Sequence, residues 1–301
     1  MRILITGAGG AAAISVWKSL SAGHELHMAD MDPLAAGLYL VPPDRRLIIP
    51  RGDAPELVPA LLEACRERRV EALLPTVDAE LAPVAAAGDR FGSIGVALPI
   101  SPVECLRLCR DKQLLMEAVQ GKVPIPDNEP LTEAVAARVD SFPRFAKPRQ
   151  GAGSRGVARI DSRADLDKQP KDGSVMLQEY LPGEEYSVDV YVRRDGRVIA
   201  AVPRDRMKID SGIAVASRTL HLPDLMQSAI RTAEVIGVRG CANVQFKRAV
   251  DGVFKLLEVN PRYPGTLPLT IAAGIDIPNN KMCLDPLARF LIFQYQKSVV
   301  F

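Results

Sequence analysis

Short apolar runs alternate with longer amphipathic stretches along the first hundred residues. The runs have the length and composition of buried strands, and the stretches between them repeat apolar residues three and four positions apart, as helices do. The expected strands lie at 2–6, 25–30, 46–49, 71–74 and 94–97. The expected helices lie at 11–21, 56–68 and near 78–90. This alternation predicts a parallel sheet with helices on both faces.

The pattern changes after about residue 125, where strands follow one another more closely. Pro124, Pro126 and Pro130 make the stretch at the change resemble a linker. Two Asp-Gly pairs, at 195–196 and 251–252, each separate two alternating strands, and such pairs are strong hairpin signals. The expected strands of this half lie at 143–147, 157–160, 175–179, 185–193, 197–203, 241–249 and 253–259. We therefore expect an antiparallel α+β region after the N-terminal α/β domain.

Composition excludes several classes of protein. The 301 residues are 48% hydrophobic and 25% charged, as in an ordinary globular protein of about two domains. A net charge of +2 leaves no basic field for sequence-independent binding of nucleic acid. No apolar run approaches the ~20 residues of a membrane span. We expect the apolar C-terminal tail, FLIFQYQKSVVF, to pack against the body or a partner subunit.

Cysteine usage and the N-terminus both favour a cytoplasmic protein. The five cysteines are odd in number and scattered, so no disulfide framework is predicted. Cys105 and Cys109 stand four residues apart, but no histidine is near them in sequence, which disfavours a zinc site. The first ten residues carry glycines where a signal peptide would have its apolar stretch.

A glycine-rich turn follows the first expected strand. Gly7, Gly9 and Ala12 fit the pattern G-x-G-x-x-A, and Asp30 ends the next strand, where a ribose-binding carboxylate would stand. Taken alone, this pattern predicts a dinucleotide-binding domain. Many doubly wound domains use glycines for the same tight turn, and no residues suited to hydride transfer follow. An NAD-dependent oxidoreductase therefore stays an alternative.

A second glycine-rich loop lies between two strands and is flanked by basic residues. Lys147 ends one strand, and Arg149 and Arg155 lie within the loop that follows. The loop also contains Gly151, Gly153, Ser154 and Gly156. Such a loop can close over phosphates with backbone N–H groups and positive charge. An ordinary hairpin loop is the alternative.

Oxygen-bearing side chains recur on the two strands of the last expected hairpin. Gln245 stands on the first strand, and Glu258 and Asn260 share a face of the second. Because the Asp-Gly turn joins these strands, the three side chains can converge. Hard oxygen ligands with few charges suit Mg²⁺ that holds phosphates, although each residue alone could be a solvated strand residue.

With these motifs, in particular N-V-Q-F followed by E-x-N-P-R, the chain resembles the ATP-grasp superfamily, and most closely its carbamoyl-phosphate synthase large-subunit-like branch. The resemblance covers nearly the whole chain. It implies an α/β fold: a Rossmann-like preATP-grasp domain at 1–110, followed by a two-lobed α+β ATP-grasp domain. The two lobes would be a small lobe with the phosphate loop at 111–180 and a catalytic lobe at 181–301. The chain is too short for a complete synthase large subunit, which has two such units, so we expect a stand-alone enzyme.

The resemblance also implies a role for each motif residue. ATP would be bound by Lys112 and Lys147 at the phosphates, by Gly151, Gly153, Ser154 and Gly156 of the loop, by Glu179 and Leu181 at adenine, and by Glu185 at ribose. Mg²⁺, with two ions expected and Mn²⁺ as an alternative, would be bound by Gln245, Glu258 and Asn260. Arg262, together with Lys147, would act catalytically by neutralising the transferring phosphoryl group.

The implied activity is an ATP-dependent carboxylate–amine (or –thiol) ligase that forms an acyl phosphate and releases ADP and phosphate. Its partners would be small carboxylate and amine substrates, with a homodimer left open. The anionic groups of the substrate would meet Arg204, Arg206, Lys208 and Arg218, unless these form a solvated basic loop. Besides the oxidoreductase, two alternatives remain: an enzyme forming carboxyphosphate or carbamate with a partner, and a nucleotide-binding regulator without turnover.

Overall fold

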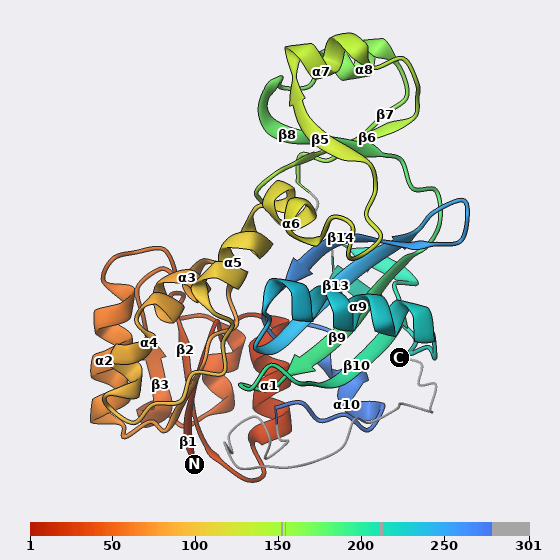
Figure 1. Ribbon diagram of the computed structural model, residues 1–301. Helices are drawn as coiled ribbons and strands as arrows, with labels where there is room; N and C mark the ends of the chain where they lie inside the picture. Colours follow the sequence, from red (N-terminus) through yellow and green to blue (C-terminus); the bar gives the residue numbers. More distant parts are fainter. Residues whose placement is uncertain (152, 154, 211–212, 279–301) are drawn as a thin grey trace.

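The computed structural model describes residues 1–151, 153, 155–210 and 213–278 (Figure 1). The first domain holds a parallel sheet of order β3-β2-β1-β4. Its strands are β1 (Arg2–Thr6), β2 (Glu25–Asp30), β3 (Arg46–Ile48) and β4 (Ala72–Leu74). Its helices are α1 (Ala11–Leu20), α2 (Leu57–Glu67), α3 (Asp78–Ala86) and α4 (Gly88–Gly92), with short 3₁₀ turns at Ala36–Leu40 and Pro43–Arg45. The expected parallel α/β architecture is confirmed.

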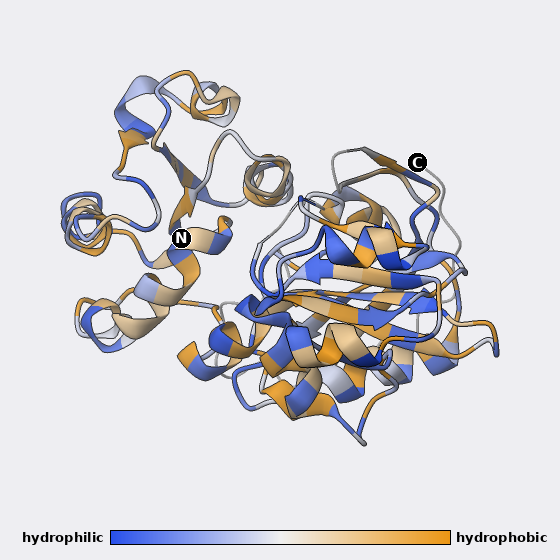
Figure 2. Cartoon of the chain, turned by 90° about the horizontal axis from the view of Figure 1, so that it is seen from above, coloured by the Kyte–Doolittle hydropathy of each residue, from blue (hydrophilic) through white to orange (hydrophobic). Residues whose placement is uncertain are grey.

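Alternating residues of the parallel strands supply two separate cores. Ile3 and Ile5 pack toward α1, whereas Leu4 packs toward α2 and α4. Figure 2 shows the helices of this domain placed around its central strands. The core beneath α1 also includes Tyr191 and Leu267 of the last lobe, so α1 packs between two parts of the chain.

The fifth strand expected at 94–97 is absent from the described fold, and this expectation was wrong. Only one bridge, between Ala72 and Ala97, joins this segment to the sheet. Gly95 adopts φ +76°, which turns the chain just before the bridge. Pro99 follows without an N–H group to extend the pairing.

Two consecutive helices lead from the first domain into the small lobe. These are α5 (Val103–Arg110) and α6 (Lys112–Val119). The small lobe has an antiparallel sheet of order β5-β8-β6-β7, built from β5 (Asn128–Thr132), β6 (Arg144–Pro148), β7 (Ala158–Ile160) and β8 (Asp172–Glu179). Helices α7 (Glu133–Arg138) and α8 (Arg163–Asp167) cover its outer face (Figure 1).

The proline-rich stretch is only partly a linker. Pro130 lies within β5, contrary to the sequence-based expectation. A proline is tolerated there because β5 is an edge strand, and its register against β8 shifts at this position.

The last lobe is a second antiparallel sheet, of order β10-β9-β13-β14. Its strands are β9 (Glu185–Val192), β10 (Val198–Asp205), β13 (Gly240–Arg248) and β14 (Phe254–Asn260), and both predicted hairpins are confirmed. The remaining elements are the β11 (Lys208–Asp210) and β12 (Ile213–Ala216) pair, α9 (Pro223–Ile236) and α10 (Leu267–Ala272). Helix α9 buries one face of this sheet; the other face packs partly into the core beneath α1 and partly borders the site. The expectation for the apolar tail concerns residues outside the described part.

Candidate nucleotide site

A cavity of about 140 Å³ lies between the small lobe and the last lobe. Side chains from both antiparallel sheets, from the first turn of α6 and from the glycine-rich loop meet there. The lining residues are Lys112, Phe145, Lys147, Pro148, Gln150, Gly151, Gly153, Arg155, Val157, Gln178, Glu185, Arg206, Gln245, Leu257 and Glu258. Residues far apart in the sequence thus converge as the motifs predict. The sequence motifs did not predict a role for Phe145 or Gln178. Gln178 follows Leu177 on β8, so the two side chains point to opposite faces of the sheet.

Lys147 is the most deeply buried cation of this cavity. It comes from β6, is only 6% exposed, and its Nζ donates to the carbonyl of Leu257 on β14 at 3.1 Å. The pKa of Lys147 is lowered to about 8, chiefly by burial; the charge of Glu258 opposes this shift, and the charge of Lys112 contributes to it. A buried lysine without a close carboxylate partner gains strongly from an added anion.

Lys112 reaches the same cavity from the first turn of α6. Its Nζ donates to the Gly151 carbonyl at 2.9 Å and lies 3.7 Å from Oε2 of Glu258. Asp111 fixes this helix start, because its carboxylate accepts hydrogen bonds from the N–H groups of Gln113 and Leu114. Asp111, which caps α6, is thus followed directly by Lys112, which reaches the cavity.

Arg149 does not point toward the cavity. Its guanidinium binds the Asp111 carboxylate at 3.1 and 2.7 Å, and its carbonyl accepts from the N–H of Lys112 at 3.0 Å. Burial opposes ionisation of Asp111, but these hydrogen bonds outweigh it and hold the pKa of this carboxyl below its usual value. Arg149 thus ties the start of the glycine-rich loop to α6.

The glycine-rich loop needs its glycines for backbone conformation. Gly151, Gly153 and Gly156 have φ values of +132°, +71° and +70°, which other residues adopt at a cost. Two of these, Gly151 and Gly153, line the cavity together with Arg155, whereas Gly156 packs against Pro148. Ser154 lies outside the described residues.

The register of β13 on β14 brings the predicted oxygen ligands together. Gln245 pairs with Glu258, and Asn243 pairs with Asn260. The Nδ2 of Asn260 donates to Oε1 of Glu258 at 3.3 Å, and Nε2 of Gln245 donates to Oδ1 of Asn243 at 3.4 Å. Gln245 and Glu258 line the cavity beside Lys147 and Lys112, whereas Asn260 contacts Glu258 and is not among the lining residues.

Glu185, predicted to bind ribose, lies at the cavity between two cations. Its Oε2 is 3.5 Å from Nε of Arg206 on one side, and its Oε1 is 3.5 Å from Nζ of Lys247 on the other. Burial lowers the pKa of Arg206, while Glu185 opposes the shift. These two contacts hold the Glu185 carboxylate between Arg206 and Lys247 at the edge of the cavity.

Glu179 and Leu181, predicted at adenine, do not line the cavity. The Glu179 carboxylate forms a 2.6 Å ion pair with Lys255, and its N–H donates to the carbonyl of Asp127 at 2.8 Å. Leu181 is 3% exposed. Both side chains therefore make contacts within the protein, so only the backbone atoms of this segment are available to a ligand.

Arg262 stands apart from the cavity lining and faces the first domain. Its Nε donates to Oδ1 of Asp78, at the start of α3, at 2.8 Å. No pattern in the sequence connects these two residues, which are 184 positions apart. The catalytic arginine of the resemblance is therefore held by the N-terminal domain.

Only one of the four basic substrate-binding candidates lines the cavity, namely Arg206. Arg204 is 2% exposed and pairs with the fully buried Asp189, so its expected role is wrong. Arg218 forms an ion pair with Asp205 at 2.8 Å, and Lys208 is exposed. A single solvated basic loop does not describe them either, because Arg204 belongs to the interior.

The N-terminal glycine turn uses its acidic residue internally. Asp30 accepts hydrogen bonds from the N–H groups of Gly9 at 2.8 Å and Asp32 at 3.0 Å. Gly37 packs so tightly on the turn that a Cβ there would come within 2.1 Å of the Ala8 carbonyl oxygen. Both carboxylate oxygens of Asp30, the ribose-binding candidate of the oxidoreductase alternative, therefore accept hydrogen bonds within the turn itself.

The described residues contain neither a preformed metal cluster nor a membrane-spanning helix. Among the residues that the structure describes, no group of three or more His, Cys, Asp or Glu side chains is positioned to hold a metal ion. No helix in the described part has both the length and the apolar character needed to cross a membrane.

Two separate segments of the chain match known protein families. Residues 171–285 match the family described as "ATP-grasp in the biosynthetic pathway with Ter operon". The chain carries an ATP-grasp domain. Residues 3–99 match the family described as "PylC-like, N-terminal domain", which fits the parallel sheet in front of the ATP-grasp lobes.

A longer protein is similar to this chain in sequence, and two solved structures are similar to it in fold. Carnosine synthase 1 of Gallus gallus is 30% identical over 309 residues, covering 87% of this chain. The chain spans about a third of the length of that relative, 32%. The fold resembles a biotin carboxylase complex from Campylobacter jejuni (TM-score 0.77, 20% identity, 96% of this chain and 72% of the other). It also resembles an L-amino acid ligase from Bacillus licheniformis (TM-score 0.73, 16% identity, 95% and 74%).

Proposed function

We propose that this protein is an ATP-dependent carboxylate–amine ligase that activates its carboxylate substrate as an acyl phosphate and releases ADP and phosphate. The observation that carries the proposal is the meeting of Lys112, Lys147 and Glu258 at one cavity. The two lysines come from α6 and β6, and the carboxylate comes from β14. Two cations beside one carboxylate suit a nucleotide polyphosphate with a bound divalent cation.

The oxygen-bearing side chains of this site suit Mg²⁺ only when phosphate oxygens complete its coordination. Glu258 supplies one carboxylate, and Gln245 and Asn260 supply amide oxygens on the same sheet face. Mg²⁺ commonly uses one or two carboxylates together with substrate phosphates, which is the set available here. When bound, Mg²⁺ would neutralise phosphate charge and orient the phosphoryl group. The solved structure of a 2-oxoglutarate carboxylase domain from Hydrogenobacter thermophilus, similar in fold, contains MgADP.

The proposed reaction has two balanced steps. A carboxylate oxygen attacks the γ-phosphorus of ATP, and the bond from that phosphorus to the bridging oxygen of ADP breaks. The amine nitrogen then attacks the acyl carbon, phosphate leaves with the electron pair of the C–O bond, and the nitrogen loses a proton to solvent. The first step makes a good leaving group from a poor one.

This chain's side chains would support the first step by charge and position. Lys147 and Lys112 would bind the phosphates, and Glu185 would accept hydrogen bonds from the ribose hydroxyls. Arg262 would stabilise charge on the transferring group, with Asp78 orienting its guanidinium from the N-terminal domain. The glycine-rich loop would exclude water from the acyl phosphate.

The domain division is part of the same proposal. It comprises a Rossmann-like preATP-grasp domain at 1–110, a small lobe at 111–180 and a catalytic lobe at 181–301. The three main sheets, which span residues 2–74, 128–179 and 185–260, support this division. We also propose a cytoplasmic setting, because Cys65, Cys105, Cys109 and Cys241 are free thiols.

The test is ADP and phosphate release from ATP and Mg²⁺ with a panel of amino acids and dipeptides as carboxylate and amine donors. The proposal predicts release that needs both donors and is lost in Glu258→Gln. Release of AMP and pyrophosphate would contradict the acyl-phosphate route. Release that needs bicarbonate alone would favour carboxyphosphate chemistry, which is suggested by the bicarbonate bound in the Hydrogenobacter structure.

A further inference from the structure

A completely buried carboxylate lies beside the oxygen-bearing side chains of the last lobe. Asp189 on β9 accepts hydrogen bonds from three side chains. Oγ1 of Thr270 on α10 donates to its Oδ2 at 2.6 Å, and Nη1 of Arg204 on β10 donates to the same oxygen. Nδ2 of Asn243 on β13 donates to its Oδ1 at 2.8 Å. The proposed reaction uses none of these four residues.

Stability of the fold does not by itself account for a buried charge of this kind. Removing a carboxylate and a guanidinium from water is costly, and well-packed apolar side chains of similar size often stabilise a fold equally well. A buried charge whose hydrogen bonds are all made does, however, fix the position of each group bonded to it. The groups bonded to Asp189 therefore indicate what its charge determines.

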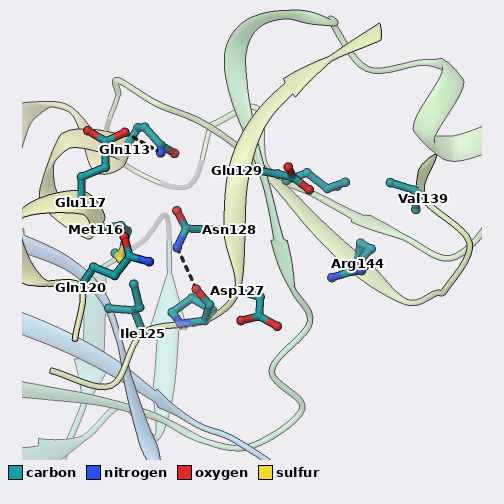
Figure 3. A pocket seen from close by; sticks show the side chains of 12 residues that line it. Gln113, Met116, Glu117, Gln120, Ile125, Asp127, Asn128, Glu129, Val139 and Arg144 are labelled. Atoms are coloured by element: carbon teal, nitrogen blue, oxygen red, sulfur yellow. Dashed lines mark hydrogen bonds between the residues drawn. The ribbon is translucent and has the colours of Figure 1, made fainter. Parts of the chain in front are cut away.

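An ionised carboxylate only accepts hydrogen bonds, so it determines which way a neighbouring amide faces. Asn243 directs Nδ2 toward Asp189, which leaves its Oδ1 on the opposite side of the amide. Figure 3 shows the same rule elsewhere in the protein, where Nε2 of Gln113 donates to the Glu117 carboxylate at 2.9 Å. The buried charge of Asp189 thus fixes the orientation of the Asn243 amide.

The orientation passes from Asn243 to Gln245, two residues further along β13. The two side chains share a face of the sheet, and Oδ1 of Asn243 accepts a hydrogen bond from Nε2 of Gln245 at 3.4 Å. A reversed Gln245 amide would bring two acceptor oxygens together here, and these repel. In the described part of the chain, this is the only hydrogen bond of the Gln245 side chain, which lines the nucleotide cavity beside Glu258. Its Oε1 is therefore the atom left for a ligand.

We propose that Asn243, held by Asp189, is a positioning residue for the metal ion, because it turns the Gln245 amide so that Oε1 rather than Nε2 meets the cation. The inference rests on the proposed binding of ATP with Mg²⁺, and it gives a function to residues that touch neither. An amide binds a cation through its oxygen alone, so its orientation matters. A carboxylate presents an oxygen in either orientation, and this difference supplies the test.

The experiment compares ATP affinity in Mn²⁺ with ATP affinity in EDTA, by calorimetric titration of the whole chain without carboxylate or amine substrates. The ratio of the two affinities measures what the metal ion contributes. Asn243→Leu should lower this ratio by ~10-fold, a usual effect of losing a group that orients a metal ligand. A merely structural loss would weaken both affinities and leave their ratio unchanged.

Replacing the ligand itself separates orientation from other effects. In Gln245→Glu, either carboxylate oxygen can meet Mn²⁺, and Oδ1 of Asn243 loses its donor. Adding Asn243→Leu to Gln245→Glu should therefore leave the ratio within ~2-fold or raise it. Thr232→Val removes a buried hydroxyl of α9 in the same lobe and, as the matched control, should keep the wild-type ratio. Asn243→Thr, which keeps a hydroxyl donor on the strand beside Asp189, gives the same comparison if Asn243→Leu does not fold.

Two results would overturn the proposal. One is a wild-type ratio in folded Asn243→Leu or Asn243→Thr protein. The other is an equal fall of the ratio in the wild-type and Gln245→Glu backgrounds, which would give Asn243 a role that does not pass through the Gln245 amide. Failure of the ligase proposal would look different, because the wild-type protein would then bind ATP no more tightly in Mn²⁺ than in EDTA, and both proposals would fall.

Discussion

ATP binding should be coupled to proton uptake by Lys147. Burial, with Lys112 nearby, lowers the pKa of this lysine to about 8, so a large part of the free protein has it neutral in mildly alkaline solution. Phosphate oxygens beside Nζ favour the charged form and raise its pKa. Binding of ATP therefore adds a proton to the fraction of Lys147 that is neutral in the free protein.

The expected uptake follows from that pKa. With a pKa of about 8 in the free protein and one well above 9 in the complex, uptake should be ~0.1 proton per ATP at pH 7, ~0.5 at pH 8 and ~0.9 at pH 9. Above pH 8, the affinity for ATP should fall by almost tenfold per pH unit, about 1.4 kcal/mol.

Calorimetric titration in two buffers of different ionisation enthalpy measures this uptake directly. Lys147→Met should bind ATP weakly and without the pH-dependent uptake. Lys122→Met, which removes an exposed lysine just beyond α6, should retain the uptake of the wild type. Uptake near zero at pH 9 in the wild type, or unchanged uptake in Lys147→Met, would refute the assignment of this lysine to the phosphates.

Four further outcomes are expected. The fold favours neutral Lys147, so its contribution to the free energy of unfolding should rise by about 2.5 kcal/mol as pH increases from 8 to 10.5. Urea unfolding of Lys147→Met should lack this rise. Glu185→Ala should weaken ATP binding by ~10-fold and that of inorganic triphosphate much less, as competition titrations would show. Asp111→Ala removes the cap of α6 and the partner of Arg149, and should lower the free energy of unfolding by about 1–3 kcal/mol in chemical denaturation. Arg262→Ala should leave ATP affinity unchanged and slow single-turnover phosphoryl transfer by ~10²-fold or more.

Local patterns predicted much of the fold and part of the site. The Asp-Gly turns determined both hairpins, and the two-residue period of the strands then placed Gln245 opposite Glu258. The order of Lys147 and the glycine loop was also readable, because both belong to one continuous segment. These features depend on residues that are close in sequence, so a local sequence pattern can predict them.

Contacts between distant segments were not readable. The Asp78–Arg262 ion pair joins two domains, and no periodicity relates its partners. Arg204 looked available because it lies in a basic stretch, but its side chain points into the interior, to Asp189. The nucleotide cavity also includes Phe145 and Gln178, which line it only once the two lobes are assembled, so no local pattern identified them.

Phosphoryl transfer in Glu258→Gln tests the central claim most directly. This substitution keeps the size of the side chain and removes the carboxylate charge from the oxygen cluster beside Lys112. ADP and phosphate formation, with the substrate pair found in the panel, is measured alongside ATP affinity in the presence of Mg²⁺. The account predicts that ATP still binds within ~10-fold of the wild type, while turnover falls by ~10²-fold or more. Turnover close to that of the wild type would contradict an ATP-grasp ligase reaction centred on Glu258.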